Sequence, residues 1–245
     1  PEYDIVILDE AHMVESVASD HLGVGLSSIA AERLLSRLYN ERTNRGLLVH
    51  YKLDDLRPDV IQARRIAEDF FSGIIHAVAD RGDGPWRILE PNLVPNTLGE
   101  VLLSLGRKIR KASDRLSSDA ERQDFQSLAD RLTSQAGSIR FWLEQDDPGS
   151  VWWVELANSR RGAPRVKLAS SPIDVSGVLR RDLFSKVDTV VLTSATLSTG
   201  TQSEAFDDTF DTENEHDAKE IGFHYLCERL GVESAIKRQL DSPFD

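Results

Sequence analysis

Residues 4–16, DIVILDEAHMVES, are the stretch of the chain that indicates its fold. An apolar run, residues 5–8, leads directly into Asp9 and Glu10. A short run rich in isoleucine and valine, with no alternation of polar residues, predicts a strand buried on both faces. Paired carboxylates at the tip of such a strand predict one wall of a nucleotide site, so the next question is which residues face them.

A second stretch, VDTVVLTSATLS at residues 187–198, repeats this pattern with hydroxyl residues in place of the acids. Two buried strands with polar C-terminal ends predict an open parallel α/β sheet, in which a ligand lies beyond those ends. A crossover between parallel strands needs about a dozen residues, whereas about 170 separate these two. We therefore predict a large helical domain inserted into a parallel-sheet domain.

The intervening residues carry helical spacing and helix-end signals. Residues 27–46 have a serine cap and a stop at Gly46, and a second helix opens with Pro58 in its first turn. Capping boxes are predicted at Thr97 with Glu100 and at Ser118 with Glu121. Residues 80–97, which contain three prolines and two glycines, are predicted to be a loop.

The pattern changes to strand after residue 149. SVWWVEL (150–156) and RVKLAS (165–170) predict a hairpin, and a short helix at 176–184 is expected to return the chain to the second buried strand. The acidic, polar segment 199–220 is expected to be a mobile loop.

Composition limits the classes of function. A net charge of −12 argues against a protein that coats nucleic acid nonspecifically, although residues 155–181 are locally basic. A single cysteine, Cys227, excludes an internal disulfide and a multi-cysteine metal site, and it is expected to be a buried apolar residue. With no apolar run of membrane-spanning length and no signal-peptide pattern at residues 1–4, we expect a cytoplasmic protein without a membrane partner.

The acids at the first strand tip suit phosphoryl transfer. Asp9, with Glu10, would hold Mg²⁺, which prefers hard oxygen ligands, while Glu10 would orient or deprotonate the water that attacks the γ-phosphate of ATP. His12 would hydrogen-bond across to the neighbouring strand end. The hydroxyl residues of LTSATLS, Ser194 and Thr196 among them, would hydrogen-bond His12 or Glu10. Through these bonds they would transmit a movement of the acid segment rather than perform catalysis.

VILDEAH followed far downstream by VVLTSATLS resembles motifs II and III of superfamily 2 helicases. The long helical insertion, the VWWVEL hairpin and the closing GFHYLCERLGVESAIKRQLDSPFD are similar to the DinG/XPD family of DNA helicases. This resemblance implies an ATP-driven motor of RecA-like, P-loop NTPase-type domains that moves 5′ to 3′ on single-stranded DNA, in DNA repair or replication. It assigns Asp9 and Glu10 to catalysis, His12 to coupling, and Ser194 and Thr196 to motif III.

The resemblance also implies a division of the chain. Residues 1–16 and 186–198 would belong to the first motor domain, 17–185 would be a helical Arch domain with its return hairpin, 199–220 the acidic loop, and 221–245 the start of the second motor domain. No Gly-Lys-Ser/Thr phosphate loop, cluster cysteines or motif VI arginine is present. We therefore expect a middle piece of such a helicase that acts with its remaining domains in cis, is inactive alone, and binds no iron–sulfur cluster, although the full-length protein could have one.

The basic cluster at the hairpin, Arg160, Arg161, Arg165 and Lys167, is a candidate for contacts with DNA, and a solvated turn is the alternative interpretation of the same residues. The basic helix segment 106–115 is expected to be a solvated face instead. Two other classes of function stay open from the sequence. One is a non-catalytic Arch module that binds DNA or docks proteins. The other is a helical interaction protein with a chance DEAH tetrapeptide, which requires that residues 4–8 and 189–193 do not form adjacent parallel strands.

Overall fold

The computed structural model describes residues 3–158, 164–197 and 223–239. The chain divides into two compact units: unit 1 comprises residues 1–22 and 172–245, and unit 2 comprises residues 23–171. A small parallel sheet and many helices place the protein in the α/β class, as the sequence predicts. The predicted loop at 199–220 lies outside the described residues.

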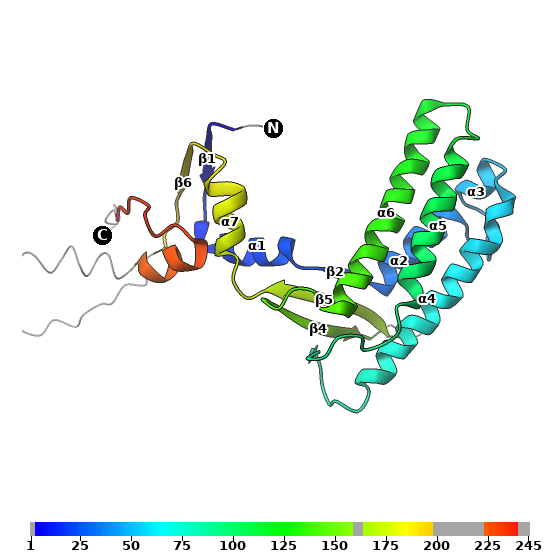
Figure 1. Ribbon diagram of the computed structural model, residues 1–245, viewed down its shortest axis with the longest axis horizontal. Helices are drawn as coiled ribbons and strands as arrows, with labels where there is room; N and C mark the ends of the chain where they lie inside the picture. Colours follow the sequence, from blue (N-terminus) through cyan, green and yellow to red (C-terminus); the bar gives the residue numbers. More distant parts are fainter. Residues whose placement is uncertain (1–2, 159–163, 198–222, 240–245) are drawn as a thin grey trace, which may run out of the picture. The chain divides into compact units, whose positions relative to one another are not determined.

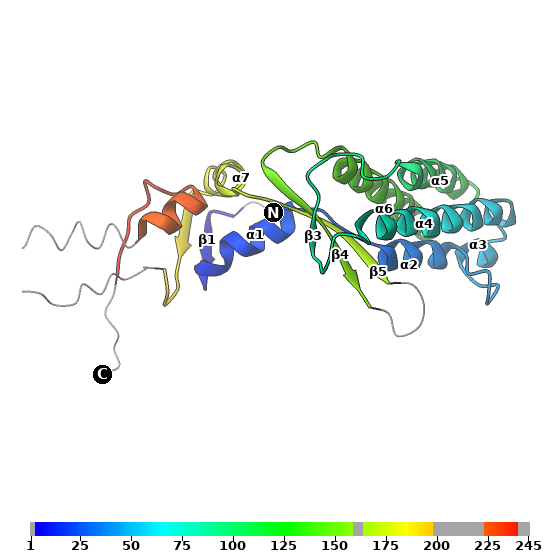
Figure 2. The same cartoon turned by 90° about the horizontal axis from the view of Figure 1, so that it is seen from below.

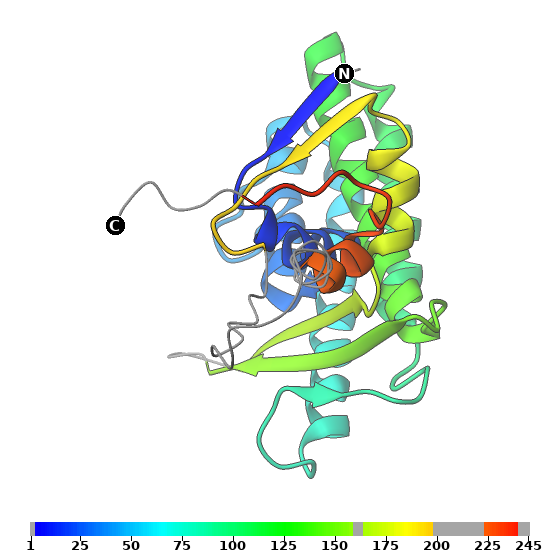
Figure 3. The ribbon, with the colours of Figure 1, turned by 90° about the vertical axis from the view of Figure 1, so that its left-hand side faces the viewer.

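Unit 1 is built on the two strands that the sequence predicts. Strand β1 (Ile5–Leu8) pairs in parallel with β6 (Thr189–Leu192), with Ile5 opposite Thr189 and Leu8 opposite Leu192 (Figure 3). These two strands lie far apart in the sequence but are adjacent and parallel in the structure. This pairing excludes the third class of function, a helical interaction protein with a chance DEAH tetrapeptide.

The prediction that these strands are buried on both faces is wrong for the described chain. Ile5 and Ile7 are 62% and 67% exposed, and Val191 is 40% exposed. The reason is that the sheet has two strands among the described residues, and two strands leave the alternating apolar side chains without a covering layer.

The remaining elements of unit 1 are short. They are a 3₁₀ turn (Ala11–Met13), α1 (Val14–Leu22), α7 (Ser176–Leu179), a π-helical turn (Arg180–Phe184) and a helix at residues 223–230. The last of these is tied to α1 by Arg229, whose Nε donates to Glu15 at 2.8 Å. It also carries Cys227, which is buried as predicted, and this burial raises the pKa of its thiol.

Unit 2 contains four long helices that lie side by side (Figure 1). They are α2 (Ser28–Leu38), α4 (Arg57–Val78), α5 (Thr97–Ser113) and α6 (Asp119–Glu144), with α3 (Leu47–His50) and a 3₁₀ turn (Asp54–Leu56) between the first two. Apolar side chains at helical spacing, such as Leu98, Leu102, Leu105 and Ile109 of α5, form the core of this unit. No helix in the described ranges is long and apolar enough to cross a bilayer.

A four-stranded sheet in the order β2-β5-β4-β3 completes unit 2, and Figure 2 shows its strands β3, β4 and β5. Its strands are β2 (Gly25–Ser27), β3 (Trp86–Arg87), β4 (Ser150–Ala157) and β5 (Arg165–Pro172). Strands β4 and β5 are neighbours, as the predicted hairpin requires, but β3 lies inside residues 80–97, which were predicted to be all loop. Trp142 of α6 fastens helix to sheet, because its indole N–H donates to the Ala169 carbonyl at 2.9 Å.

Helix ends confirm one capping prediction and correct another. Ser118 and Glu121 form a complete capping box at α6. At α5, however, Thr97 is the first helical residue, and the cap is Asn96, whose Oδ1 accepts from Gly99 N at 3.2 Å. The Asn96 amide oxygen satisfies the free N–H group of Gly99, one residue before the Glu100 N–H group that the threonine hydroxyl was predicted to bind.

Gly46 does not end the helix that begins at Ser28. That helix ends at Leu38, where Tyr39 becomes extended, and Gly46 instead precedes α3 with a φ of 138°. A Cβ at this glycine would lie 2.4 Å from the Leu38 carbonyl oxygen.

We expect Gly46→Ala to lower the free energy of unfolding by about 2 kcal/mol or more, because the backbone conformation is strained for an L residue and the methyl group meets backbone. Gly137→Ala is the matched control. That glycine lies inside α6 with open space around its Cβ position, so alanine should stabilise by about 0.5–1 kcal/mol. Chemical denaturation of the two variants measures the difference, and equal effects would contradict the account.

Candidate functional site

The backbone of unit 1 brings the two predicted motifs together. Thr193 N donates to the Leu8 carbonyl at 2.9 Å, and Ala11 N donates to the Thr193 carbonyl at 2.9 Å. These bonds continue the parallel pairing beyond the strand ends. Both polar segments, residues 9–12 and 193–196, therefore leave the sheet at the same edge, where parallel sheets bind their ligands.

Asp9 is held by a residue that the sequence analysis did not select. The Thr193 hydroxyl donates to Asp9 Oδ1 at 2.8 Å, across 184 positions of sequence. The signal that could have found it is the register, because pairing Leu8 with Leu192 places the next residues, Asp9 and Thr193, side by side.

Ser194 connects the other two predicted residues of the DEAH segment. Its Oγ lies 2.9 Å from His12 Nδ1 and 3.3 Å from Glu10 Oε2. A hydroxyl has one proton, so both bonds form together when Nδ1–H of His12 donates to Ser194 and Ser194 donates to Glu10. Thr196 joins the same group, with its N–H donating to Ser194 Oγ at 3.3 Å.

Glu10 has a left-handed backbone, with φ 51° and ψ 45°. An L residue pays about 1–2 kcal/mol for this conformation. The turn lets the chain leave β1 and enter the 3₁₀ turn at Ala11, which is fully buried, while the Glu10 side chain stays 65% exposed. The carboxylate is thus presented to solvent at the strand tip from a fixed backbone.

A Mg²⁺ ion is compatible with these residues, although they make only part of its coordination. The described residues contain no cluster of three or more His, Cys, Asp or Glu side chains suited to a metal. Mg²⁺ is usually held by one or two carboxylates, with waters and substrate phosphates supplying the rest. Asp9 fits such a role, because Thr193 occupies Oδ1 and no hydrogen bond involves Oδ2 in the part of the chain described here.

The predicted DNA-binding cluster is only partly visible. Arg160 and Arg161 lie outside the described residues. Lys167 is paired with Glu155, Nζ to Oε1 at 3.1 Å, which neutralises much of its charge. The Glu155 carboxylate also accepts a hydrogen bond from the Trp153 indole N–H. This bond, and to a smaller extent the one from Lys167, lowers the pKa of Glu155.

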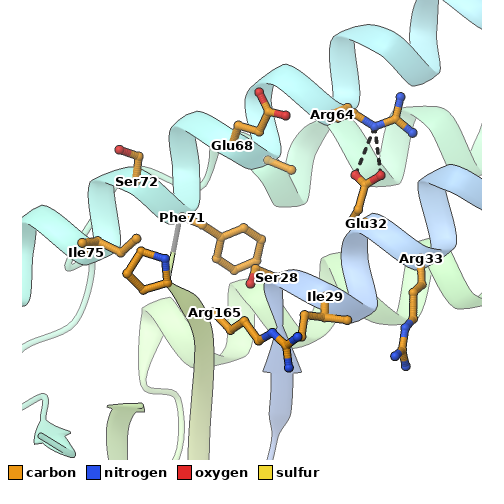
Figure 4. Close-up of a pocket in the computed structure, with 12 residues that line it drawn as sticks. Ser28, Ile29, Glu32, Arg33, Arg64, Glu68, Phe71, Ser72, Ile75 and Arg165 are labelled. Atoms are coloured by element: carbon orange, nitrogen blue, oxygen red, sulfur yellow. Dashed lines mark hydrogen bonds and ion pairs between the residues drawn. The ribbon is translucent and has the colours of Figure 1, made fainter. Parts of the chain in front are cut away.

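Arg165 is exposed and lines a hollow of about 470 Å³ between α2 and α4. Figure 4 shows its guanidinium beside Ile29, with Phe71 and Ile75 making the apolar wall. Arg64 does not face a ligand here, because its Nε donates to Glu32 at 3.0 Å. This hollow belongs to unit 2, whereas the DEAH residues belong to unit 1.

Three cations of the basic helix segment 106–115 are paired with acids from other elements. Lys108 meets Asp59 at 2.6 Å and Arg115 meets Asp55 at 2.7 Å, while Arg110 pairs with Asp130. These partners fit the prediction of a solvated face rather than a DNA contact.

Comparison with known proteins finds relatives along the whole chain. It is 25% identical over 247 residues to ATP-dependent DNA helicase YoaA of Escherichia coli (strain K12) and 24% identical over 254 residues to YoaA of Haemophilus influenzae. It is 23% identical over 285 residues to 3′-5′ exonuclease DinG of Bacillus subtilis (strain 168). No family model matches the chain.

Each alignment covers all of this chain but a minor part of the relative: 33%, 33% and 28% of their lengths. The chain thus spans about a third of the length of the curated relatives it matches. Similarity to helicases named YoaA and to a protein named DinG confirms the resemblance of this chain to a segment of DinG/XPD-family helicases.

Proposed function

We propose that this chain is part of an ATP-dependent DNA helicase that couples ATP hydrolysis to 5′-to-3′ movement on single-stranded DNA, in repair or replication. The observation that carries the proposal is the contact between His12, Glu10 and Ser194, made by segments 182 or more positions apart. Hydrogen bonds between an acid motif and a hydroxyl motif at one sheet edge are what a site that links hydrolysis to movement requires.

In this mechanism the chain's own residues position the reacting groups. Glu10 would align the attacking water and accept its proton, and Asp9, oriented by Thr193, would hold Mg²⁺. When bound, Mg²⁺ neutralises charge on the phosphate oxygens. The site is open to solvent in the described chain, with Glu10 65% exposed, so enclosing it is the task of a facing surface.

Coupling would run through the hydrogen-bonded group. His12 donates to Ser194 and Ser194 to Glu10, so a change at the Glu10 carboxylate during hydrolysis alters the bonds available to β6 and the residues after it. This arrangement gives Ser194, and through it Thr196, a positioning role.

The domain assignment extends the same proposal. Residues 1–16 and 186–198 would contribute to a RecA-like motor domain, 17–185 would form the Arch insertion, and 199–220 and 221–245 would lead into the second motor domain. The compact unit at 23–171, mainly helical with its own core, supports an inserted domain.

Hydrolysis assays test the function. The 245 residues contain no Gly-Lys-Ser/Thr loop, so the purified chain alone should show no DNA-stimulated phosphate release. The full-length product of its gene should show both DNA-stimulated hydrolysis and strand separation. DNA-stimulated hydrolysis by the isolated chain would contradict the proposal that hydrolysis needs residues outside these 245. A full-length product that does not hydrolyse ATP would contradict the proposed function itself.

A further inference from the structure

Three arginines meet at a groove between α2 and α6 that the sequence analysis did not select. Arg33 and Arg37 lie one turn apart on α2, and Arg131 approaches from α6. They line a hollow of about 470 Å³, together with Ser134 and Gln135 of α6 and Ala30 and Leu34 of α2. None of the described residues lining it is acidic.

Among the described residues these arginines have no counter-ion, unlike several other cations of unit 2. Arg64, Lys108, Arg110, Arg115 and Arg122 of the same unit are each within an ion pair. Within the described ranges, Arg33, Arg37 and Arg131 form none, and all three are exposed. Figure 4 shows Arg33 pointing away from the Glu32–Arg64 pair, toward the open side of α2. In a chain of net charge −12, such a concentration of free positive charge favours an anionic ligand.

Gln135 adds a second polar feature. Its Oε1 is buried and accepts no hydrogen bond among the described residues. A buried acceptor without a donor is unfavourable, and a rotation of the Gln135 side chain that turns Oε1 toward an N–H group of a ligand in the groove would relieve it. The groove therefore offers three guanidinium groups for an anion and, after this rotation, one acceptor for an N–H donor.

We propose that this groove, defined by Arg33, Arg37, Arg131 and Gln135, binds single-stranded DNA, with phosphates on the arginines and a base N–H on Gln135. The assignment rests on the DNA-helicase function proposed above. Guanidinium groups bind phosphate through two parallel hydrogen bonds, and the rise of about 6 Å from Arg33 to Arg37 along the helix suits successive phosphates of an extended strand.

The neighbouring hollow between α2 and α4 is less suited to the same strand. Its rim carries Glu32 and Glu68, which repel phosphate, and Phe71 is only 6% exposed, so its ring offers no open face for a base to stack on. An acidic peptide is the competing ligand for the three-arginine groove, and the test separates the two.

Binding of a fluorescein-labelled oligo-dT strand to the 245-residue chain, without nucleotide, tests the proposal. Arg33→Ala/Arg37→Ala/Arg131→Ala should weaken binding at least about tenfold and reduce the slope of log K against log salt by about 2, at about 0.7 for each lost phosphate contact. The matched control is Arg65→Ala/Arg81→Ala/Arg107→Ala, which removes three exposed, unpaired arginines elsewhere in unit 2 and should change binding less than about twofold.

Circular dichroism should show both triple variants folded, because the altered side chains are exposed and form no ion pair in the described chain. Gln135→Leu should weaken binding of a mixed-sequence strand without lowering stability. Equal loss in the two triple variants, absence of binding by the unaltered chain at low salt, or stronger competition by an acidic peptide than by unlabelled DNA would each overturn the assignment. Because no ATP is present, this outcome is independent of ATP hydrolysis, which substitution of Glu10 tests separately.

Discussion

Glu10→Gln is expected to lower DNA-stimulated ATP hydrolysis by the full-length gene product about 10²- to 10⁴-fold, the range for loss of a general base. Glutamine keeps the shape of the side chain and its hydrogen bond from Ser194, but an amide oxygen cannot take a proton from water at neutral pH. Nucleotide binding should be nearly unchanged, because the substitution removes an interaction used in the transition state. Phosphate release and binding of a fluorescent ATP analogue measure the two quantities separately.

Asp20→Asn is the control for this substitution. Asp20 is exposed on α1 in the same unit, so the variant removes one carboxylate charge without touching the strand tip. Glu10→Gly is a useful second variant, since glycine adopts the left-handed backbone at no steric cost and should be as inactive as glutamine without loss of stability. Hydrolysis within tenfold of the unaltered protein in Glu10→Gln would remove Glu10 from the proposed role.

Much of unit 1 could be predicted because its signals are local. An apolar run that ends in polar residues marks a strand and its functional end, and two such runs predict a shared sheet edge. Thr193 was missed because selecting it needs the register, which depends on how two distant strands align. The exposure of Ile5 and Ile7 was missed because a strand pattern shows which side chains are apolar but does not show what covers them.

In unit 2 the same limit applies to helix ends and to charge. Ser118 and Glu121 cap α6 as predicted. At α5 both Asn96 and Thr97 can act as N-cap, and the structure uses Asn96 rather than the predicted Thr97. Charged runs in the sequence proved poor guides to free charge, because Lys167 is paired with Glu155. Three unpaired arginines are instead gathered at one groove from α2 and α6, about a hundred residues apart, and only packing brings such residues together.

Ser194→Ala is expected to separate hydrolysis from movement in the full-length protein. The hydroxyl touches His12 and Glu10 but carries no proton away from the attacking water in the proposed mechanism. DNA-stimulated hydrolysis should therefore stay within about fivefold of the unaltered enzyme, while strand separation per ATP falls at least about tenfold. Parallel measurements of phosphate release and unwinding of a forked DNA give this ratio.

Ser185→Ala is the matched control, because this serine also belongs to unit 1 and its hydroxyl donates to a backbone carbonyl, that of Arg181, at 2.8 Å. It should leave the ratio unchanged. His12→Ala should lower the ratio as Ser194→Ala does, and the double variant should be no worse than Ser194→Ala, since both single changes break the same His12–Ser194 hydrogen bond. Additive losses would mean that His12 and Ser194 act separately, and a proportional loss of hydrolysis and unwinding would make Ser194 part of the hydrolytic site rather than its link to movement.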